Sequence, residues 1–472
     1  MSRRSRFGAF NAREHTPSIL VATISAAFGV CLLQATGMLT QIIEADDVTG
    51  DSRTVAALLR IVSAVFIVIA VYVSSIVTSN TFATIIAGRT RTIALLRLIG
   101  SSAVTQRRAV AREGLAVGVI GALVGTVVGT AATVALVGVG TAAGTIPDLP
   151  YGYVHPDLVL PIVAVVLTTW LASWVGSRRV LVVSPMQATG AAQEHSLEEV
   201  GSRRARNGIA ITLFAIGTAL LIAGVVVGLV SPLGVLIGIV GGLFSFTGIV
   251  LGAQLVMPPA LRLVGRAFGR SAPARLAAEN AVRYPERSSR TTIGLVIGVT
   301  LVTMFAVAVE SYQQMLLRAQ AANPTYYGGI DESLQITVVV FSVLIGFSAL
   351  IAAVGMVNNL SLSVLQRRRE LGLLRALGFT GRQMRSMILA ESAQLTTAAV
   401  LVGLVLGTVY GWAGAQSLLG GITGSPGIIW PAIPLPLLGV IIVAAGVLTL
   451  VASIAPSRRA TRVTPVIALA VD

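Results

Sequence analysis

Long uncharged apolar stretches alternate with short arginine-rich segments along the whole chain. A transmembrane helix needs about 20 consecutive apolar residues. Ten stretches meet this length, at residues 18–40, 61–84, 114–138, 158–176, 208–230, 233–256, 291–309, 334–358, 392–415 and 435–455. The pattern predicts an all-α polytopic membrane protein with about ten transmembrane helices, and nine or eleven are the alternatives. Only Ser231 and Pro232 separate the fifth and sixth stretches, for which a re-entrant pair is the alternative.

The chain also contains one unit twice. Residues 91–100 (RTIALLRLIG) and 369–378 (RELGLLRALG) are identical at five of ten positions, at an offset of 278. The same offset pairs Arg107 with Arg385, Glu113 with Glu391, Gly125 with Gly403, and Gly129 with Gly407. A further block, SRR at 177–179, returns at 457–459 with an offset of 280. Two fused copies of one membrane unit explain this pattern, and the glycines spaced four apart predict helix-packing faces.

Each copy holds four of the ten stretches, and the other two stretches link the copies. We therefore expect a first four-span repeat in residues 1–192, a linker with two linking spans in 193–270, and a second four-span repeat in 271–472. Equivalent positions are six spans apart, an even number, so both copies point the same way across the membrane. This parallel arrangement excludes a simple inverted-repeat carrier. It places both arginine-rich loops on one face, where two identical partners can bind.

The distribution of arginine predicts the orientation of the chain. All 34 basic residues are arginine, and 31 of them fall on one side of the ten-span topology; the other side holds only Arg53, Arg60 and Arg318. By the positive-inside rule both termini are cytoplasmic, and the first span is retained as an anchor because no persuasive cleavage site follows it. A net charge of +15 also suggests nucleic acid. The arginines lie in short loops without aromatic interleaving, however, so we predict contact with anionic membrane lipid and no nucleic-acid partner.

Composition excludes most catalytic chemistry. Hydrophobic residues make up 55% of the chain and charged residues only 11%. A Walker A loop needs a lysine, and the chain has none, so any nucleotide must be bound by a partner. No Asp or Glu lies inside the ten stretches, which disfavours ion-coupled transport. Cys31 and the three scattered histidines lack ligand spacing, so we predict no catalytic residue, metal site or cofactor.

The duplicated charged segment predicts a short helix between two spans. Leu371, Leu374 and Leu377 recur at helical spacing, Arg375 lies on another face, and Gly378 is a helix stop. The equivalent positions of the first copy are Ile93, Leu96, Ile99, Arg97 and Gly100. An amphipathic helix lying on lipid headgroups is one interpretation. Its duplication at matched depth favours the other interpretation, a docking site for a soluble protein.

Residues 367–378 (RRRELGLLRALG), together with the later run PSRRA at 456–460, resemble the FtsX-like permease domain of MacB-type ABC transporters. In that family the first run is the coupling helix that seats in a cleft of the ATPase. The 4 + 2 + 4 order of spans is similar to the ten-span BceB-type permeases. The large extracellular domain of those permeases is missing, because the connections at 41–60 and 312–331 are short.

The resemblance implies a non-catalytic permease subunit in the bacterial cytoplasmic membrane, working with a separate ABC ATPase in two copies. It implies export or extraction of a lipophilic or peptide substrate, including antimicrobial peptides, at the outer leaflet. The expected ATPase contacts are Leu96, Arg97, Gly100, Leu374, Arg375 and Gly378, with Arg369 and Glu370 supporting the second site. One alternative is an FtsX-type mechanotransmitter that regulates an extracytoplasmic enzyme or sensor kinase without moving a substrate. Another is a carrier that functions without an ATPase.

Overall fold

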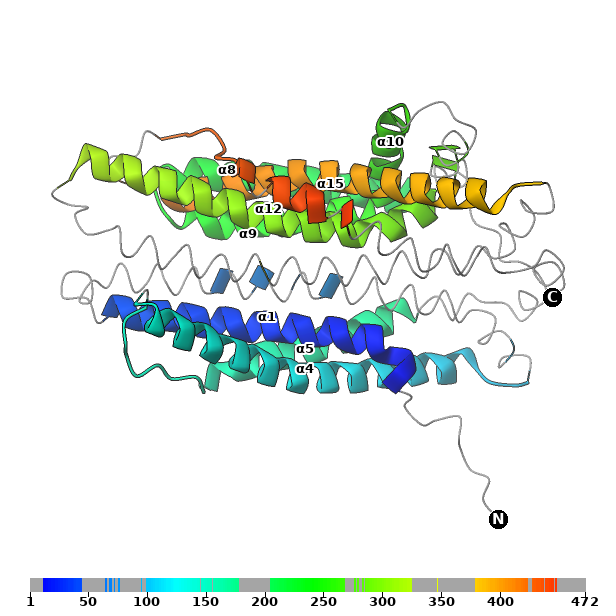
Figure 1. Cartoon of the computed structure of the whole chain (residues 1–472), viewed down its shortest axis with the longest axis horizontal. Helices are drawn as coiled ribbons and strands as arrows, with labels where there is room; N and C mark the ends of the chain where they lie inside the picture. The colour runs from blue at the N-terminus through cyan, green and yellow to red at the C-terminus, as the bar shows by residue number, and fades with distance from the viewer. Residues whose placement is uncertain are drawn as a thin grey trace, which may run out of the picture. The chain divides into compact units, whose positions relative to one another are not determined.

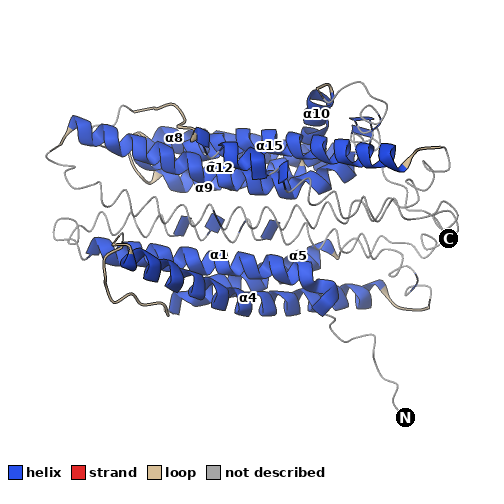
Figure 2. Cartoon of the chain, in the orientation of Figure 1, coloured by secondary structure: helices blue, strands red, loops and turns tan. Residues whose placement is uncertain are grey.

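The computed structural model describes most of the long helices of the chain. The described residues are 12–44, 64–65, 68–69, 72, 75–76, 95, 99–144, 146–154, 156–177, 204–267, 276, 278–279, 282–283, 285–324, 346, 378–422, 427–436, 438–444 and 446–447. Over these residues the fold is helical and contains no strand (Figure 2). The predicted all-α class is therefore confirmed for the described part.

Seven described helices are long and apolar enough to cross a membrane. Their candidate spans are Ser18–Ala35, Ala103–Ala142, Pro156–Val175, Ala205–Gly228, Gly234–Leu251, Thr292–Ala322 and Gly381–Leu419. Each of them overlaps one stretch predicted from the sequence. The remaining predicted stretches, 61–84, 334–358 and 435–455, fall wholly or partly outside the described residues, so the count of ten stays a prediction.

The chain divides into two compact units (Figure 1). Unit 1 comprises Met1–Asp51 and Leu59–Ala191, and unit 2 comprises Ser52–Leu58 and Ala192–Asp472. The division into two repeats with a separate linking part, at 192 and 270, stays a prediction.

Unit 1 contains α1 (Ala12–Glu44), α4 (Ala103–Ala142) and α5 (Val159–Gly176), which follows the short 3₁₀ helix η1 (Pro156–Leu158). The 40 residues of α4 are about 60 Å long at 1.5 Å per residue, roughly twice the hydrocarbon thickness of a bilayer. Its first turns carry Arg107, Arg108, Arg112 and Glu113. The helix therefore begins well before its apolar part, which is why the predicted stretch starts only at residue 114.

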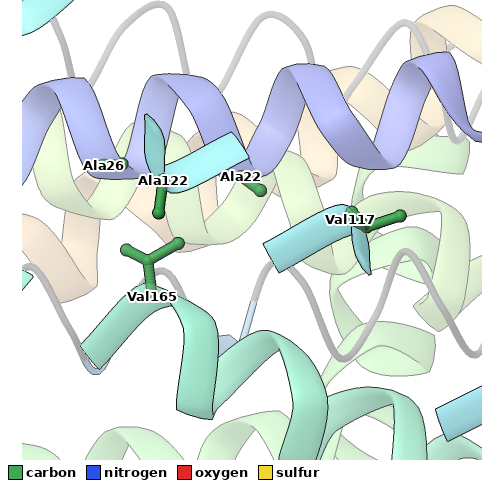
Figure 3. Packing of buried hydrophobic residues seen from close by; sticks show 5 residues of the cluster. All are labelled: Ala22, Ala26, Val117, Ala122 and Val165. Atoms are coloured by element: carbon green, nitrogen blue, oxygen red, sulfur yellow. The ribbon is translucent and has the colours of Figure 1, made fainter. Parts of the chain in front are cut away.

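Small residues let the helices of unit 1 approach each other closely. Ala22 and Ala26 of α1 pack with Val117 and Ala122 of α4 and with Val165 of α5 (Figure 3). Glycines of α4 bring the two backbones together at Gly121, Gly125 and Gly129, each facing α1. Such faces stabilise helix association in a membrane through close packing.

Unit 2 contains α8 (Arg204–Gly228), α9 (Gly234–Leu251), α10 (Ala253–Gly265), α12 (Pro285–Ala322) and α15 (Gly381–Leu419). The pair α12 and α15 repeats the packing of α1 and α4. Gly403, Gly407 and Gly411 of α15 face α12, so the predicted glycine faces of both copies are confirmed as packing faces.

In each unit a polar side chain of a long helix, α1 or α12, forms a hydrogen bond with a chain segment that is distant in the sequence. In unit 1, the Gln34 amide Nε2 donates to the Tyr153 carbonyl at 2.8 Å. In unit 2, the Ala432 amide donates to Ser311 Oγ at 3.3 Å. Nearby, burial raises the pKa of the Tyr151 phenol, and electrostatic interaction with Tyr153 and Asp148 raises it further. This phenol therefore stays protonated and donates to the Pro147 carbonyl at 2.7 Å.

Candidate coupling site

Each repeat has the same kind of backbone turn, at the glycine that ends the duplicated charged segment. Gly100 has φ +98° and Gly378 has φ +95°, a region that glycine adopts without the steric cost paid by other residues. In the first copy the Ile99 amide still bonds the Leu95 carbonyl at 3.2 Å, which is a helical hydrogen bond. The helical segment therefore ends at the glycine, as the sequence predicts for a helix stop.

The N-cap of a long helix lies two residues after each glycine. Ser102 caps α4, and its Oγ accepts from the Thr105 amide at 3.1 Å. Thr380 caps α15, where its Oγ1 accepts from the Gln383 amide at 3.2 Å and its own amide donates to Gln383 Oε1 at 2.9 Å. The second arrangement is a capping box. We call residues 99–105 the first elbow and residues 378–384 the second elbow.

Only two of the eight predicted contact residues fall within the described part of the chain. They are Gly100 and Gly378, one in each elbow. Leu96, Arg97, Arg369, Glu370, Leu374 and Arg375 lie outside the described residues, and their contact with an ATPase stays a prediction. Beside Gly100, the Ile99 side chain is 81% exposed, so an apolar residue of the predicted docking face is accessible in unit 1.

The second elbow is anchored by apolar packing. Met384, Met387 and Ile388 in the first turns of α15 form a buried cluster, against which Phe379 and Leu276 pack. Because Phe379 directly follows Gly378, the cluster fixes the turn to the body of unit 2. The turn at Gly378, the start of α15 and Leu276 are thus joined through one buried cluster.

The first elbow is anchored differently, by a cation–π contact. The guanidinium carbon of Arg107 lies 4.0 Å from the centre of the Trp174 ring, near the end of α5. Arg385, the equivalent of Arg107, is exposed. Such contacts contribute about 0.5–2 kcal/mol depending on desolvation. The sequence pairs Arg107 with Arg385 but gives no signal for Trp174, which comes from a different helix.

A buried amide that sequence reasoning missed lies further along α15. Gln394 is 1% exposed, and its Nε2 donates to the Leu261 carbonyl of α10 at 2.9 Å. The amide is accommodated by Gly265, where a Cβ would lie 2.7 Å from Gln394 Nε2. A glutamine inside an apolar helix was the available signal, but its partner is distant in sequence.

The elbow geometry makes one substitution informative. Gly378→Ala places a side chain at φ +95°, which we expect to destabilise the turn by about 1–2 kcal/mol. Hydrogen exchange of the capped Gln383 and Met384 amides should then rise roughly tenfold, since 1.4 kcal/mol corresponds to a factor of ten. The measurement is hydrogen–deuterium exchange of peptides covering the start of α15.

Gly381→Ala is the matched control for this substitution. Gly381 opens α15 only three residues later, has no positive φ, and has open space where a Cβ would lie. Its exchange should stay unchanged. Equal exchange in both variants would show that the backbone conformation of Gly378 does not hold the elbow.

These features define a class of protein: a multi-pass membrane protein with an internal duplication, in which each copy has an elbow leading into a long apolar helix. The family described as FtsX-like permease C-terminal matches residues 64–185 and again residues 342–465. The two matches begin 278 residues apart and together cover just over half of the chain. The chain belongs to the FtsX-like permease family.

Two curated relatives are named as ABC transporter permeases of Bacillus subtilis (strain 168). The uncharacterized ABC transporter permease YknZ is 32% identical over 120 residues, which are 25% of this chain and 28% of YknZ. The ABC transporter permease YtrF is 26% identical over 131 residues, which are 26% of this chain and 30% of YtrF. The matched part thus spans less than a third of either relative.

Proposed function

We propose that this chain is the transmembrane permease subunit of an ABC transporter and contains no catalytic site of its own. A separate ATPase subunit, in two copies, docks on the segments that end at Gly100 and Gly378. Hydrolysis of ATP by the partner moves these segments, and α4 and α15 carry the motion across the membrane. The proposal places both termini in the cytoplasm of a bacterial cell and assumes ten spans in all.

The observation that carries this proposal is the repetition of the elbow. In each copy a glycine at positive φ lies two residues before the N-cap of a long rigid helix, and the chain contains this arrangement twice. Two such elbows provide two similar docking sites, as two copies of one partner require. Membership of the FtsX-like permease family and the names of the two relatives support an ABC transporter as the setting.

For the substrate we propose a lipophilic molecule or a peptide, exported or extracted at the outer leaflet. The connections at residues 41–60 and 312–331 are short, so recognition falls to the spans and their ends. The same short connections disfavour a mechanotransmitter, which has to hold an enzyme or a sensor kinase outside the cell.

The test is purification of the tagged full chain from its native membranes in mild detergent, with quantitative mass spectrometry of what accompanies it. We expect an ATPase with a Walker A motif at about two copies per permease, in line with the two elbows. A folded, well-expressed chain that brings down no ATPase contradicts the proposal. Recovery of an extracytoplasmic enzyme or a sensor kinase with the ATPase, and no substrate movement in vesicles, supports the mechanotransmitter instead.

A further inference from the structure

The helices between the two repeats pack along α15 from Gln394 to its C-terminal end. In Figure 1, α8 and α9 run alongside α15, whereas α10 runs across the direction of these long helices. All of them belong to unit 2. Three sets of contacts, at the arginine-rich end, the middle and the far end of α15, show how they are attached.

At the arginine-rich end, α10 bridges the first and third spans of the second repeat. Gln394 of α15 donates to the Leu261 carbonyl of α10 at 2.9 Å. At the other end of α10, Ser289 Oγ of α12 donates to the Ala253 carbonyl at 3.0 Å. Both bonds are buried, where a lost partner leaves a polar group unsatisfied at a cost of about 1–3 kcal/mol. α10 is therefore a brace between α12 and α15, close to the second elbow.

In the middle, α9 is attached to α15 through one tyrosine. The Tyr410 hydroxyl and Ser245 Oγ are hydrogen-bonded at 2.9 Å. The Phe246 ring meets the Tyr410 ring edge-on, with centroids 6.1 Å apart. Leu221 and Val225 of α8 complete the contact against Ala413. Polar and aromatic contacts together define the register between the three helices.

At the far end, the backbones touch. A Cβ at Gly228 of α8 would lie 2.6 Å from the Ser417 carbonyl oxygen, so only glycine fits there. A Cβ at Gly421, just after α15, would lie 3.0 Å from the Leu229 carbonyl oxygen. From Gln394 to Gly421 the attachment covers 28 residues, about 40 Å at the helical rise of 1.5 Å per residue.

The first repeat has none of these side chains at the equivalent positions. At the offset of 278, Gln394, Tyr410 and Ser417 correspond to Ala116, Ala132 and Val139. Val139 is 70% exposed in unit 1 and Ala132 is exposed too. The equivalent face of α4 thus has no amide, phenol or hydroxyl with which to hold such a hairpin.

We infer that the two linking helices and the brace α10 form one rigid body with the second repeat and move with it when the transporter works. The inference rests on the proposed function for the source of that motion. Under it the two halves of the permease are mechanically unequal: the second elbow carries the pair α8 and α9 with it, and α4 lacks the side chains that make this attachment on α15. The linking helices then transmit the motion of the second elbow to the opposite face of the membrane.

A disulfide between α9 and α15 tests this inference. A Cβ at Gly238 would lie 3.6 Å from the Ser417 Cβ, within the range of about 3.5–4.5 Å that disulfides require. Cys31, the single native cysteine, is first replaced in a Cys31→Ala background. Gly238→Cys/Ser417→Cys is then oxidised in native membranes, with each single-cysteine variant as control.

If the helices form one rigid body, the disulfide should form in most of the protein molecules. ATP hydrolysis by the cross-linked complex should stay within about twofold of that of the reduced complex, because an interface inside a rigid body does not change during rotation. A loss greater than about tenfold that reduction reverses would overturn the inference, since α9 then has to slide on α15. Failure to cross-link also overturns it, provided both cysteines react singly in detergent.

The two proposals fail separately in this experiment. Cross-linking in membranes needs no ATPase, so a chain without an ATPase partner contradicts the proposed function while the disulfide yield still reports on the interface. If Gly238→Cys disturbs folding, Leu221→Cys/Ala413→Cys joined by a short bifunctional thiosulfonate makes the same measurement between α8 and α15, which pack together there.

Discussion

Reversing the charge of both predicted docking arginines, Arg97→Glu/Arg375→Glu, should remove most of the ATPase that copurifies with the chain. An arginine paired with an acidic partner in an interface contributes about 2–5 kcal/mol to the measured loss when it is removed. Even 1.4 kcal/mol at one site lowers affinity about tenfold. Since the duplication supplies two sites, the double variant should lose ATPase by more than about tenfold, as measured by quantitative mass spectrometry.

A control with the same change of charge separates docking from general electrostatics. Arg262→Glu/Arg266→Glu alters net charge equally, and both side chains are exposed, Arg262 on α10 and Arg266 directly after it. This variant should keep its ATPase. If both double variants lose the partner equally, the arginines act through the overall positive field of that face. If neither variant loses it, the segments 91–100 and 369–378 are not the docking helices.

Single variants should reveal unequal docking sites. The second segment has Glu370 and Gly372 where the first has Thr92 and Ala94, and only the second resembles the family run closely. Arg375→Glu alone is therefore expected to cost more ATPase than Arg97→Glu alone. Equal losses would mean that the ATPase uses only what the two segments share.

The second large effect concerns the glycine face of α4. Gly125→Ala should lower the stability of the protein by about 1–3 kcal/mol, and Gly125→Leu by more, because a closely packed interface cannot absorb extra atoms. A Cβ at this position would collide with the Thr23 carbonyl of α1 and would lie 2.6 Å from the Ala26 Cβ and 2.9 Å from the Ala27 amide nitrogen. The readout is the midpoint of thermal unfolding in detergent.

Gly138→Ala, on the same helix, is the control for this substitution. No atom lies within 4 Å of a Cβ at Gly138, so its midpoint should stay unchanged or rise slightly. In the second repeat, Gly407→Ala should behave like Gly125→Ala, because a Cβ there would lie 2.7 Å from the Thr300 carbonyl. Gly414→Ala, in open space, should behave like Gly138→Ala. Equal stability of packed and open variants would contradict the packing role of the glycine faces.

Much of the architecture could be predicted because membrane helices obey strict rules of length and hydropathy. The seven described candidate spans all overlap predicted stretches. The glycines at 125, 129, 403 and 407 were expected to be packing faces, and each lies against the neighbouring helix of its own repeat. Gly100 and Gly378 were expected to stop helices, and both have positive φ. A helical hydrogen bond before Gly100 confirms the stop in the first copy, whereas the residues before Gly378 lie outside the described part of the chain.

The anchoring contacts were not predictable in the same way. Arg107 meets Trp174 across 67 residues, and Gln394 meets Leu261 across 133. Nothing in the local pattern of an apolar helix says which neighbour a polar side chain will find. Likewise, the boundary in the sequence at Ser231-Pro232 marks two linking helices but not the repeat to which they attach.

The sequence by itself determined that the chain is an apolar, helical membrane protein and that it contains one unit twice, because these depend on composition and on repeated residues. The parallel direction of the two repeats stays a prediction, because it depends on the number of spans. Only the tertiary structure decided that α8, α9 and α10 attach to the second repeat. That choice depends on a few contacts of α15. The side chains of Gln394 and Tyr410 bond α10 and α9, and the backbone at Ser417 touches Gly228 of α8. Hydrophobicity drives helices into a membrane, but contacts between particular atoms select which helices pack together.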